Sequence, residues 1–311
     1  MNSIAAQIVA AEPAPSPEFL RSRRSVSVVM VVYMTGEALE QSLACVLADP
    51  LVDELVVVDN GSTPAEAERL RALDGQGGRV RLLTGHGNVG FAKGANLGAA
   101  KAKGEILVFL NPDAFLQAGC IAALSREVED RAAPCLVGGR VLNSDGTEQR
   151  GARRGEITPM SAVLSMSGLA KGRTLGRYEV HWEGDTLPDH AVPTPTISGA
   201  CFCMRRADFD QVGGFDEGYF LHVEDVDLCW RVRQAGGEVL FHPQAEVIHI
   251  GGTSQTSPLK VEFHKGVGLA RYFRKRADSV GERALAWALS PLVVIAAVVR
   301  PLVWRLTGRT G

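Results

Sequence analysis

Four short apolar segments alternate with helix-like segments between residues 25 and 110, and this alternation constrains the fold more than any other feature of the chain. The first apolar run, Ser25–Tyr33 (SVSVVMVVY), is typical of a strand buried on both faces of a parallel sheet. The other predicted strands are Glu54–Val58, Arg79–Leu83 and Glu105–Leu110, and the predicted helices between them are Glu37–Leu47, Ala65–Leu73 and Phe91–Lys103. Regular alternation of this kind predicts an α/β fold with a mostly parallel sheet and helices on both faces.

The rest of the chain divides less regularly. Residues 140–195 are expected to form irregular loops of the kind that recognise acceptors. We then expect a strand at Thr196–Arg205, a helix at Glu224–Gln234, a late strand at Glu246–Ile250 and helices over Pro258–Gly311. The predicted organisation is a disordered tail without the marks of an export signal (residues 1–24), an α/β domain (25–255) and a C-terminal helical segment (256–311).

Composition excludes several classes of protein. With 46% apolar and 22% charged residues, the chain falls among ordinary globular proteins. A net charge of −2 argues against a nucleic-acid partner, because such proteins carry a dominant basic surface. Six cysteines without a CxxC pair indicate reduced thiols and a cytoplasmic location.

The charge is unevenly distributed, however. Residues 259–311 carry ten Lys or Arg against three Asp or Glu, so that an acidic body bears a basic tail. Within the tail, Ala284–Val299 contains no charged residue but is shorter than the ~20 residues that a spanning helix needs. This pattern favours a segment lying on the inner face of the plasma membrane over one that spans it. A solvated helical face, or a helix packed on the domain, is the alternative.

Polar residues follow two of the predicted strands, where α/β sheets bind their ligands. Asp59 is followed by Asn60, Gly and Ser, which is either ordinary turn chemistry or a carboxylate for a nucleotide base or ribose. Asn111-Pro-Asp113 closes the EILVFL strand and is either a loop feature or a ligand for Mg²⁺ or Mn²⁺, which favour oxygen ligands.

The sequence GHGNVG, residues 85–90, offers a rival function because it matches the GxGxxG pattern of dinucleotide-binding oxidoreductases. It follows the third strand rather than the first, and no acid ends a strand ~20 residues later to hold a ribose. We therefore interpret Asn88, Gly90, Lys93 and Asn96 as parts of a loop and helix that approach a diphosphate. An NAD(P)-binding oxidoreductase and a non-catalytic scaffold that binds sugar nucleotides are kept as alternatives.

The most specific stretch is GGFDEGYFLHVEDVDLCWR, residues 213–231. Glu224, Asp225 and Asp227 crowd the start of a predicted helix, where acids are electrostatically favoured, and Asp227 with Arg231 forms an i,i+4 pair. Capping accounts for one or two acids but not for the preceding aromatic loop, which we interpret as a pocket wall. His249, taken alone, is typical of a core or edge histidine.

Together these motifs resemble the family-2 inverting glycosyltransferases, in particular the rhamnosyltransferase-like bacterial members. VVVDNGST, NVGFAKGANLG, FLNPDA, GGFDEGYF, EDVDLCWR and VIHIGG occur in the family's order between about Ser25 and Ser254. The resemblance implies a GT-A fold, in which a nucleotide-binding half adjoins an acceptor-binding half. Met34 departs from the family, which usually has Asn after the tyrosine of the first strand.

The resemblance also implies the roles of individual residues. Asp225 matches the catalytic base and Glu224 its acidic neighbour. Asp113 matches the last acid of the metal-binding DxD element, with Asn111 in place of its first acid, and His249 matches a histidine that completes the metal or diphosphate site. The residues assigned to nucleotide-sugar binding are Tyr33, Glu37, Asp59, Asn60, Asn88, Gly90, Lys93, Asn96 and Asn111.

The expected reaction is a single in-line displacement with inversion, assisted by Mg²⁺ or Mn²⁺. The expected donor is dTDP-L-rhamnose, and galactofuranose or another hexose from a UDP-sugar is the alternative. A basic, apolar tail fits an acceptor that is a lipid-linked glycan of cell-envelope polysaccharide synthesis.

Overall fold

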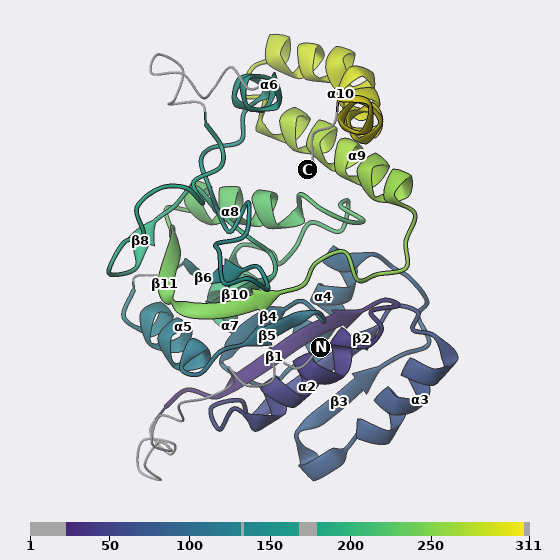
Figure 1. Cartoon of the computed structure of the whole chain (residues 1–311). Helices are drawn as coiled ribbons and strands as arrows, with labels where there is room; N and C mark the ends of the chain where they lie inside the picture. Colours follow the sequence, from purple (N-terminus) through teal and green to yellow (C-terminus); the bar gives the residue numbers. More distant parts are fainter. Residues whose placement is uncertain (1–22, 132–133, 168–178, 308–311) are drawn as a thin grey trace.

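A nine-stranded sheet forms the centre of the computed structural model, which describes residues 23–131, 134–167 and 179–307 (Figure 1). In sheet order its strands are β3 (Val80–Leu83), β2 (Glu54–Asp59), β1 (Val26–Val32), β4 (Ile106–Leu110), β10 (Cys201–Arg205), β6 (Cys135–Leu142), β11 (Glu238–His249) and β5 (Ala114–Leu116), and the short β8 (Val192–Pro193) pairs with β11. β7 (Arg153–Arg154) and β9 (Thr196–Ile197) form a separate two-stranded sheet. The predicted disordered tail lies outside the described residues, except for its last two positions.

The direction of the strands agrees with the sequence prediction. β3, β2, β1 and β4 are parallel neighbours, and β1 is in register with β2 so that Val32 lies opposite Asp59. β10 runs antiparallel to both β4 and β6, whereas β11 is parallel to β6. The predicted mostly parallel α/β sheet is therefore confirmed, with antiparallel insertions in its second half.

Helices cover both faces of the sheet because its strands are apolar on both sides. In β1, Val28, Met30 and Val32 belong to one hydrophobic cluster and Val29 and Val31 to the other. α2 (Ala38–Ala48), α3 (Pro64–Leu73) and α5 (Cys120–Glu129) pack on the first face, and α4 (Phe91–Lys101), α7 (Arg206–Gln211) and α8 (Glu224–Gln234) on the second, while a 3₁₀ turn, η1 (Gln76–Gly78), precedes β3. Gly98 lets α4 approach β1, since a Cβ there would lie 2.5 Å from Val29 Cγ1.

The second half of the chain departs from the prediction at β9 and β10. The single strand predicted over Thr196–Arg205 is broken, because residues 198–200 separate β9 from β10. The two pieces belong to different sheets: Ile197 pairs with Arg153 of β7, and Cys201 pairs with Leu110 of β4. The interruption brings the turn at Gly199 to the carboxyl end of β4.

The late strand is longer than predicted, because β11 starts at Glu238 rather than at Glu246. A register shift between His242 and Glu246 contains Pro243, which has no N–H to donate, and this interruption concealed the strand in the sequence. The segment expected to be irregular also contains a helix, α6 (Pro159–Ser167).

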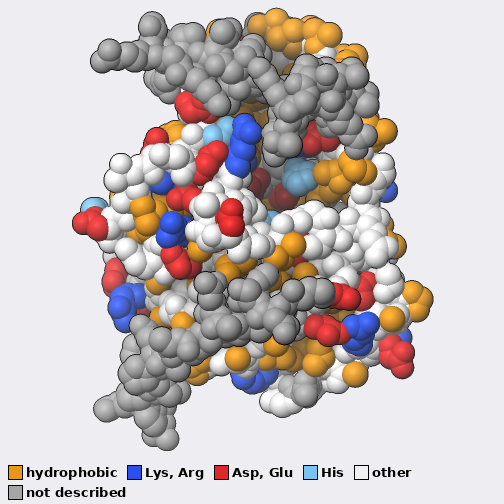
Figure 2. Space-filling model, in the orientation of Figure 1, with side chains coloured by type: hydrophobic (Ala, Val, Ile, Leu, Met, Phe, Trp, Pro, Cys, Tyr) orange, Lys and Arg blue, Asp and Glu red, His pale blue; other side chains and the backbone are white. Residues whose placement is uncertain are grey.

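Two helices follow the sheet, α9 (Pro258–Arg276) and α10 (Val280–Thr307), and lie together at one end of the molecule (Figure 1). α9 packs into the same core as α8 through Tyr272 and Phe273. Gly266 brings α10 close, since a Cβ there would lie 2.9 Å from Val294 Cα. The first 20 residues of α10 have a mean hydropathy of 1.7, enough to cross a membrane by length and composition, and side chains of this helix form an apolar edge (Figure 2).

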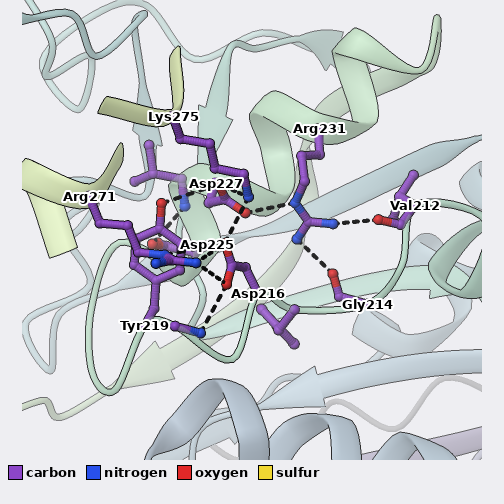
Figure 3. Close-up of polar contacts among 12 residues, drawn as sticks. Val212, Gly214, Asp216, Tyr219, Asp225, Asp227, Arg231, Arg271 and Lys275 are labelled. Carbon is purple, nitrogen blue, oxygen red and sulfur yellow. Dashed lines mark hydrogen bonds and ion pairs between the residues drawn. The ribbon is translucent and has the colours of Figure 1, made fainter. Parts of the chain in front are cut away.

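A buried carboxylate fastens α9 to the domain. Asp227 has no exposed surface and lies 2.7 Å from Arg231 Nε, 2.7 Å from Lys275 Nζ and 3.2 Å from the Tyr219 hydroxyl (Figure 3). Nearby, Asp216 accepts from Arg271 and Lys275. Basic residues of the tail are thus partly neutralised inside the molecule, which reduces the charge that the sequence assigned to a membrane surface.

Replacing the buried carboxylate tests this attachment. Asp227→Asn leaves the charges of Arg231 and Lys275 without their shared counter-ion, so we expect a loss of about 3–5 kcal/mol of unfolding free energy. Urea denaturation measures it. Glu68→Gln, the same chemical change at an exposed position of α3, is the control and is expected to stay within about 0.5 kcal/mol of the parent. Equal stability of the two variants would contradict the role of Asp227.

Candidate active site

The carboxyl ends of β1 and β2 form one corner of the candidate site. Asp59 Oδ1 accepts from the backbone N–H groups of Gly61 at 3.0 Å and Ser62 at 2.7 Å, so Oδ2 is left outside this turn. Asn60 is buried, donates to Gly90 O at 2.9 Å and lies 3.1 Å from His86 Nε2. Asp59 therefore uses one carboxylate oxygen to stabilise the turn, whereas Asn60 holds the start of α4.

Tyr33 and its neighbours complete this corner. The ring of Tyr33 lies 3.4 Å from the position that a Cβ on Gly61 would take, which leaves little space between the two turns. Met34 has a φ of +46°, in the left-handed region where Asn is favoured, and this accounts for the family's usual Asn at that position. Glu37 is exposed just before α2. Thr35, which the sequence did not single out, is buried, and its Oγ1 has no partner among the described residues.

The Gly-rich segment before α4 approaches the protein's own backbone. Gly90 has a φ of +85°, and a Cβ there would lie 2.6 Å from Phe220 O. Asn96 binds the same loop by exchanging hydrogen bonds of 2.9 Å with the backbone N–H and C=O of Phe215. Asn96 therefore positions the aromatic loop, whereas Asn88 and Lys93 are exposed at the surface.

Asn111, Asp113 and His249 come together, although 136 residues separate the last two. The chain passes directly from β4 to β5, which pairs with the end of β11, so these side chains meet there. His249 Nε2 lies 3.1 Å from Asp113 Oδ1 and 3.2 Å from Asn111 Nδ2. Burial acts to raise the pKa of Asp113, but interactions with His249 and Thr253 hold it below its usual range.

Gln149, which sequence reasoning missed, fixes the orientation of His249. Its Nε2 donates to His249 O at 3.0 Å, so its Oε1 is the acceptor facing His249 Nδ1 at 2.7 Å. Nδ1 therefore carries a proton, and Nε2 is the ring nitrogen that faces Asp113 and Asn111 and would bind a metal once it is without a proton. Histidines that bind metals are oriented in this way by a second partner.

The donor set fits a divalent cation that also binds a substrate. On an octahedral ion with metal–ligand bonds of ~2.1 Å, two ligand atoms at right angles lie ~3.0 Å from each other. The distance between Asp113 Oδ1 and His249 Nε2 is 3.1 Å. No group of three His, Cys, Asp or Glu side chains suited to a metal occurs among the described residues, so substrate oxygens or water would supply further ligands.

The acids at the start of α8 lie beside this site. Asp225 Oδ2 accepts from Arg154 Nη2 at 2.6 Å and from Gly199 N at 3.1 Å. The residue after Gly199 accepts from Asn111 N at 2.9 Å, so one short turn links Asp225 to the predicted metal site. Arg154 and Gly199 were not predicted as site residues. Arg154 falls in the loop-rich middle of the sequence, where no motif marks it.

The adjacent carboxyl groups of Glu224 and Asp225 on α8 have pKa values shifted in opposite directions. Burial acts to raise the pKa of Asp225, but the positive charge of Arg154 and its hydrogen bond hold that pKa below its usual range. Burial and the negative charge of Asp225 raise the pKa of Glu224 to about 8, and Glu224 Oε2 has no partner among the described residues. At neutral pH, Asp225 is therefore ionised and Glu224 is largely protonated.

With this geometry established, comparison with known proteins identifies the family. A family model described as glycosyl transferase family 2 matches residues 27–213, more than half of the chain. The chain belongs to glycosyl transferase family 2. A second model, described as the N-terminal domain of galactosyltransferase, matches residues 186–252.

Two relatives are named as rhamnosyltransferases. The N-acetylglucosaminyl-diphospho-decaprenol L-rhamnosyltransferase of Mycobacterium tuberculosis is 30% identical over 235 residues, which cover 71% of this chain and 75% of the relative. Rhamnosyltransferase WbbL of Escherichia coli is 25% identical over 178 residues, 52% of this chain and 61% of the relative. The resemblance to rhamnosyltransferase-like members of family 2 is confirmed.

Solved structures support the fold. GalNAc-T7 with UDP, GalNAc and Mn²⁺ has a TM-score of 0.60 at 19% identity; the match covers 85% of this chain but only 51% of GalNAc-T7. The mannosyltransferase PcManGT from Pyrobaculum calidifontis, in complex with GDP-Man and Mn²⁺, has a TM-score of 0.57 at 16% identity, over 99% of this chain and 81% of PcManGT. These neighbours confirm the GT-A fold. The family-2 assignment also replaces the oxidoreductase interpretation of GHGNVG.

The raised pKa of Glu224 predicts how stability depends on pH. Between its ordinary pKa of 4.5 and about 8, the folded protein keeps a proton that the unfolded chain releases, so stability is lost as pH rises through this window. Glu224→Gln removes the titration. The difference between the melting temperature of the variant and that of the parent should therefore increase in favour of the variant as pH rises from 5 to 8, measured by calorimetry. A constant difference across this range would show that Glu224 does not titrate as described.

Proposed function

We propose that this family-2 glycosyltransferase transfers L-rhamnose from dTDP-L-rhamnose, with inversion, to a hydroxyl of a lipid-linked glycan. The observation that carries the proposal is the position of Asp225, an ionised carboxylate joined through Gly199 to the segment that bears Asn111 and Asp113. The names of the two relatives support the sugar, and that of the mycobacterial one supports an acceptor carried by decaprenyl diphosphate. A galactofuranosyl or other hexosyl donor on UDP is the second candidate, favoured by the match to a galactosyltransferase model.

The nucleotide diphosphate would occupy the crevice beyond the ends of β1, β2 and β4. Asp59 Oδ2 is available to accept from the base or ribose, beside the ring of Tyr33. Lys93 is exposed on the first turn of α4 and would bring its positive charge to the diphosphate. This arrangement would leave the sugar between Asp59 and α8.

Asp113 and His249 would hold Mg²⁺ or Mn²⁺, with Asn111 beside them. When bound, the ion offsets negative charge on the departing nucleotide diphosphate. His249 keeps the required tautomer through Gln149, and Thr253 donates to Asp113 Oδ2 at 2.9 Å, which orients the carboxylate. The Mn²⁺ in the structures of GalNAc-T7 and PcManGT supports this proposal.

Asp225 acts as the base in this proposal. Its carboxylate accepts the proton of the acceptor hydroxyl as that oxygen attacks the anomeric carbon from the face opposite the leaving group. Arg154 and Gly199 N keep the carboxylate ionised and oriented before the reaction. Protonated Glu224 avoids a second negative charge beside it. A single base on one face of the sugar predicts inversion.

Two substitutions at adjacent positions distinguish the roles of the acids. Asp225→Asn should lower the transfer rate by about 10²–10⁴-fold, because it removes the base. Glu224→Gln resembles the protonated side chain and should remain within about threefold of the parent at pH 7, as expected for a group that is not the base. The rates of both variants are measured as dTDP released from dTDP-L-rhamnose. UDP-sugars are tested in parallel, and EDTA is the control for metal dependence.

The reverse order of effects would assign the base to Glu224 instead. Release of UDP but not dTDP would replace the rhamnosyl donor with the second candidate. If calorimetry shows that the protein binds sugar nucleotides but no transfer to any acceptor is detected, the protein is a non-catalytic scaffold rather than an enzyme.

Gln149→Leu tests the orientation of His249. Loss of the acceptor for Nδ1–H allows the ring to turn and change tautomer, so the Mn²⁺ concentration for half-maximal activity should rise about 10–100-fold. Gln244→Leu, the same change at an exposed residue of β11, should leave it unchanged. A similar Mn²⁺ dependence in both variants would remove Gln149 from the metal site.

We also propose that the enzyme works at the inner face of the plasma membrane, with α10 in contact with the bilayer. The first 20 residues of this helix are apolar, and 11% of its most apolar window is buried in the molecule. Such a location would bring the domain to a lipid-linked acceptor.

A further inference from the structure

A cavity of about 790 Å³ lies between the start of α6 and the two C-terminal helices. Its walls are mainly aliphatic and aromatic side chains, including Leu269 and Phe273 of α9 and Leu289, Val293 and Ala296 of α10. The volume lies within the ~300–1,000 Å³ of sites that enclose a ligand of moderate size. Water gains little from such walls, so the cavity is suited to an apolar occupant.

One end of the cavity is lined by two charged side chains of α9. Glu262 and Lys265 line it on α9, and both side chains contribute to the electrostatic environment of His222, which also includes Asp225 and Arg154. α9 approaches this loop closely, since a Cβ on Gly268 would lie 3.0 Å from His222 O. The segment of α9 that lines the cavity therefore also packs on the loop that leads to Asp225 at the start of α8.

The other end continues onto the apolar surface of α10. Leu285 and Leu292 line the cavity and yet are 58% and 61% exposed. Hydrophobic side chains gather along the edge of the molecule that α10 forms (Figure 2). An apolar chain that enters the cavity beside Glu262 and Lys265 can thus remain against apolar side chains until it reaches the surface that α10 would present to a bilayer.

We propose that this cavity binds the isoprenoid chain of a lipid-diphosphate acceptor, with the acceptor sugar at Asp225 and the chain passing between α9 and α10. The inference rests on the proposed function, because the acceptor class comes from the decaprenol acceptor in the name of the mycobacterial relative. Lys265 contributes a positive charge at the end where the acceptor's diphosphate would lie. The apolar walls bind the isoprene units that follow the diphosphate.

Two tryptophan substitutions on adjacent residues of α10 test the assignment. Ala296→Trp fills the cavity, whereas Ile295→Trp places the same side chain at a residue that does not line it. With an N-acetylglucosaminyl-diphospho-decaprenol acceptor, Ala296→Trp should raise KM about tenfold, the loss expected when a few buried methylene groups are displaced. With an acceptor of one or two isoprene units, and in Ile295→Trp with either acceptor, KM should stay at the parent value.

Equal changes for long and short acceptors, or a parent-like KM for the long acceptor in Ala296→Trp, would overturn the assignment. Binding of decaprenyl diphosphate in detergent micelles, followed by calorimetry, separates this result from a failure of the proposed function. If the parent transfers no sugar but Ala296→Trp weakens this binding, the cavity assignment stands and the proposed reaction is wrong. If both variants bind like the parent, the cavity is not the isoprenoid site. Melting temperatures close to that of the parent confirm that both variants fold.

Discussion

Asp227 is a carboxylate without exposed surface on which Tyr219, Arg231 and Lys275 converge from the loop before α8, α8 itself and α9. A buried charge is costly unless its partners are complete, so these segments are held in one arrangement. Arg231 also donates to Val212 O at 2.5 Å and Gly214 O at 2.6 Å, which fixes the beginning of the aromatic loop. The start of α8, with both candidate catalytic acids, is positioned by this network. Its position then allows Asp225 to meet Gly199 at the end of the sheet.

Three acids within four residues therefore have three different environments. Asp227 is paired on all sides and is structural. Asp225 is ionised beside Arg154, and Glu224 is buried next to Asp225 and retains its proton to about pH 8. Carboxyls whose surroundings separate their pKa values are those to which acid and base roles can be assigned. In the proposed reaction only Asp225 accepts a proton, and the protonated state of Glu224 prevents mutual repulsion from displacing it.

The sequence predicted the first half of the sheet, because apolar periodicity and the residues at strand ends are local signals. It also predicted that Asn111, Asp113 and His249 lie together, because the order of the family motifs pointed to the distant histidine. The site roles assigned from the resemblance stay predictions. Asn60 and Asn96 illustrate what a motif cannot reveal, since the structure uses their amides to hold Gly90 and Phe215. Gln149 and Arg154 could not be found, because they lie in a stretch without periodicity and reach His249 and Asp225 across 100 and 71 positions of sequence.

The C-terminal tail combines charges that face inward with apolar residues that face outward. Arg271 and Lys275 pair with Asp216, whose pKa falls to about 2 because the two cations outweigh the effect of its burial. These cations consequently contribute less to attraction by anionic lipids than the sequence suggested. At the proposed membrane location, contact with a bilayer would depend mainly on the apolar surface of α10, and apolar burial is not screened by salt as surface charge is. Attachment of α9 through Asp216 and Asp227 would then hold the catalytic crevice at a fixed height above the membrane, where a lipid-linked acceptor presents its sugar.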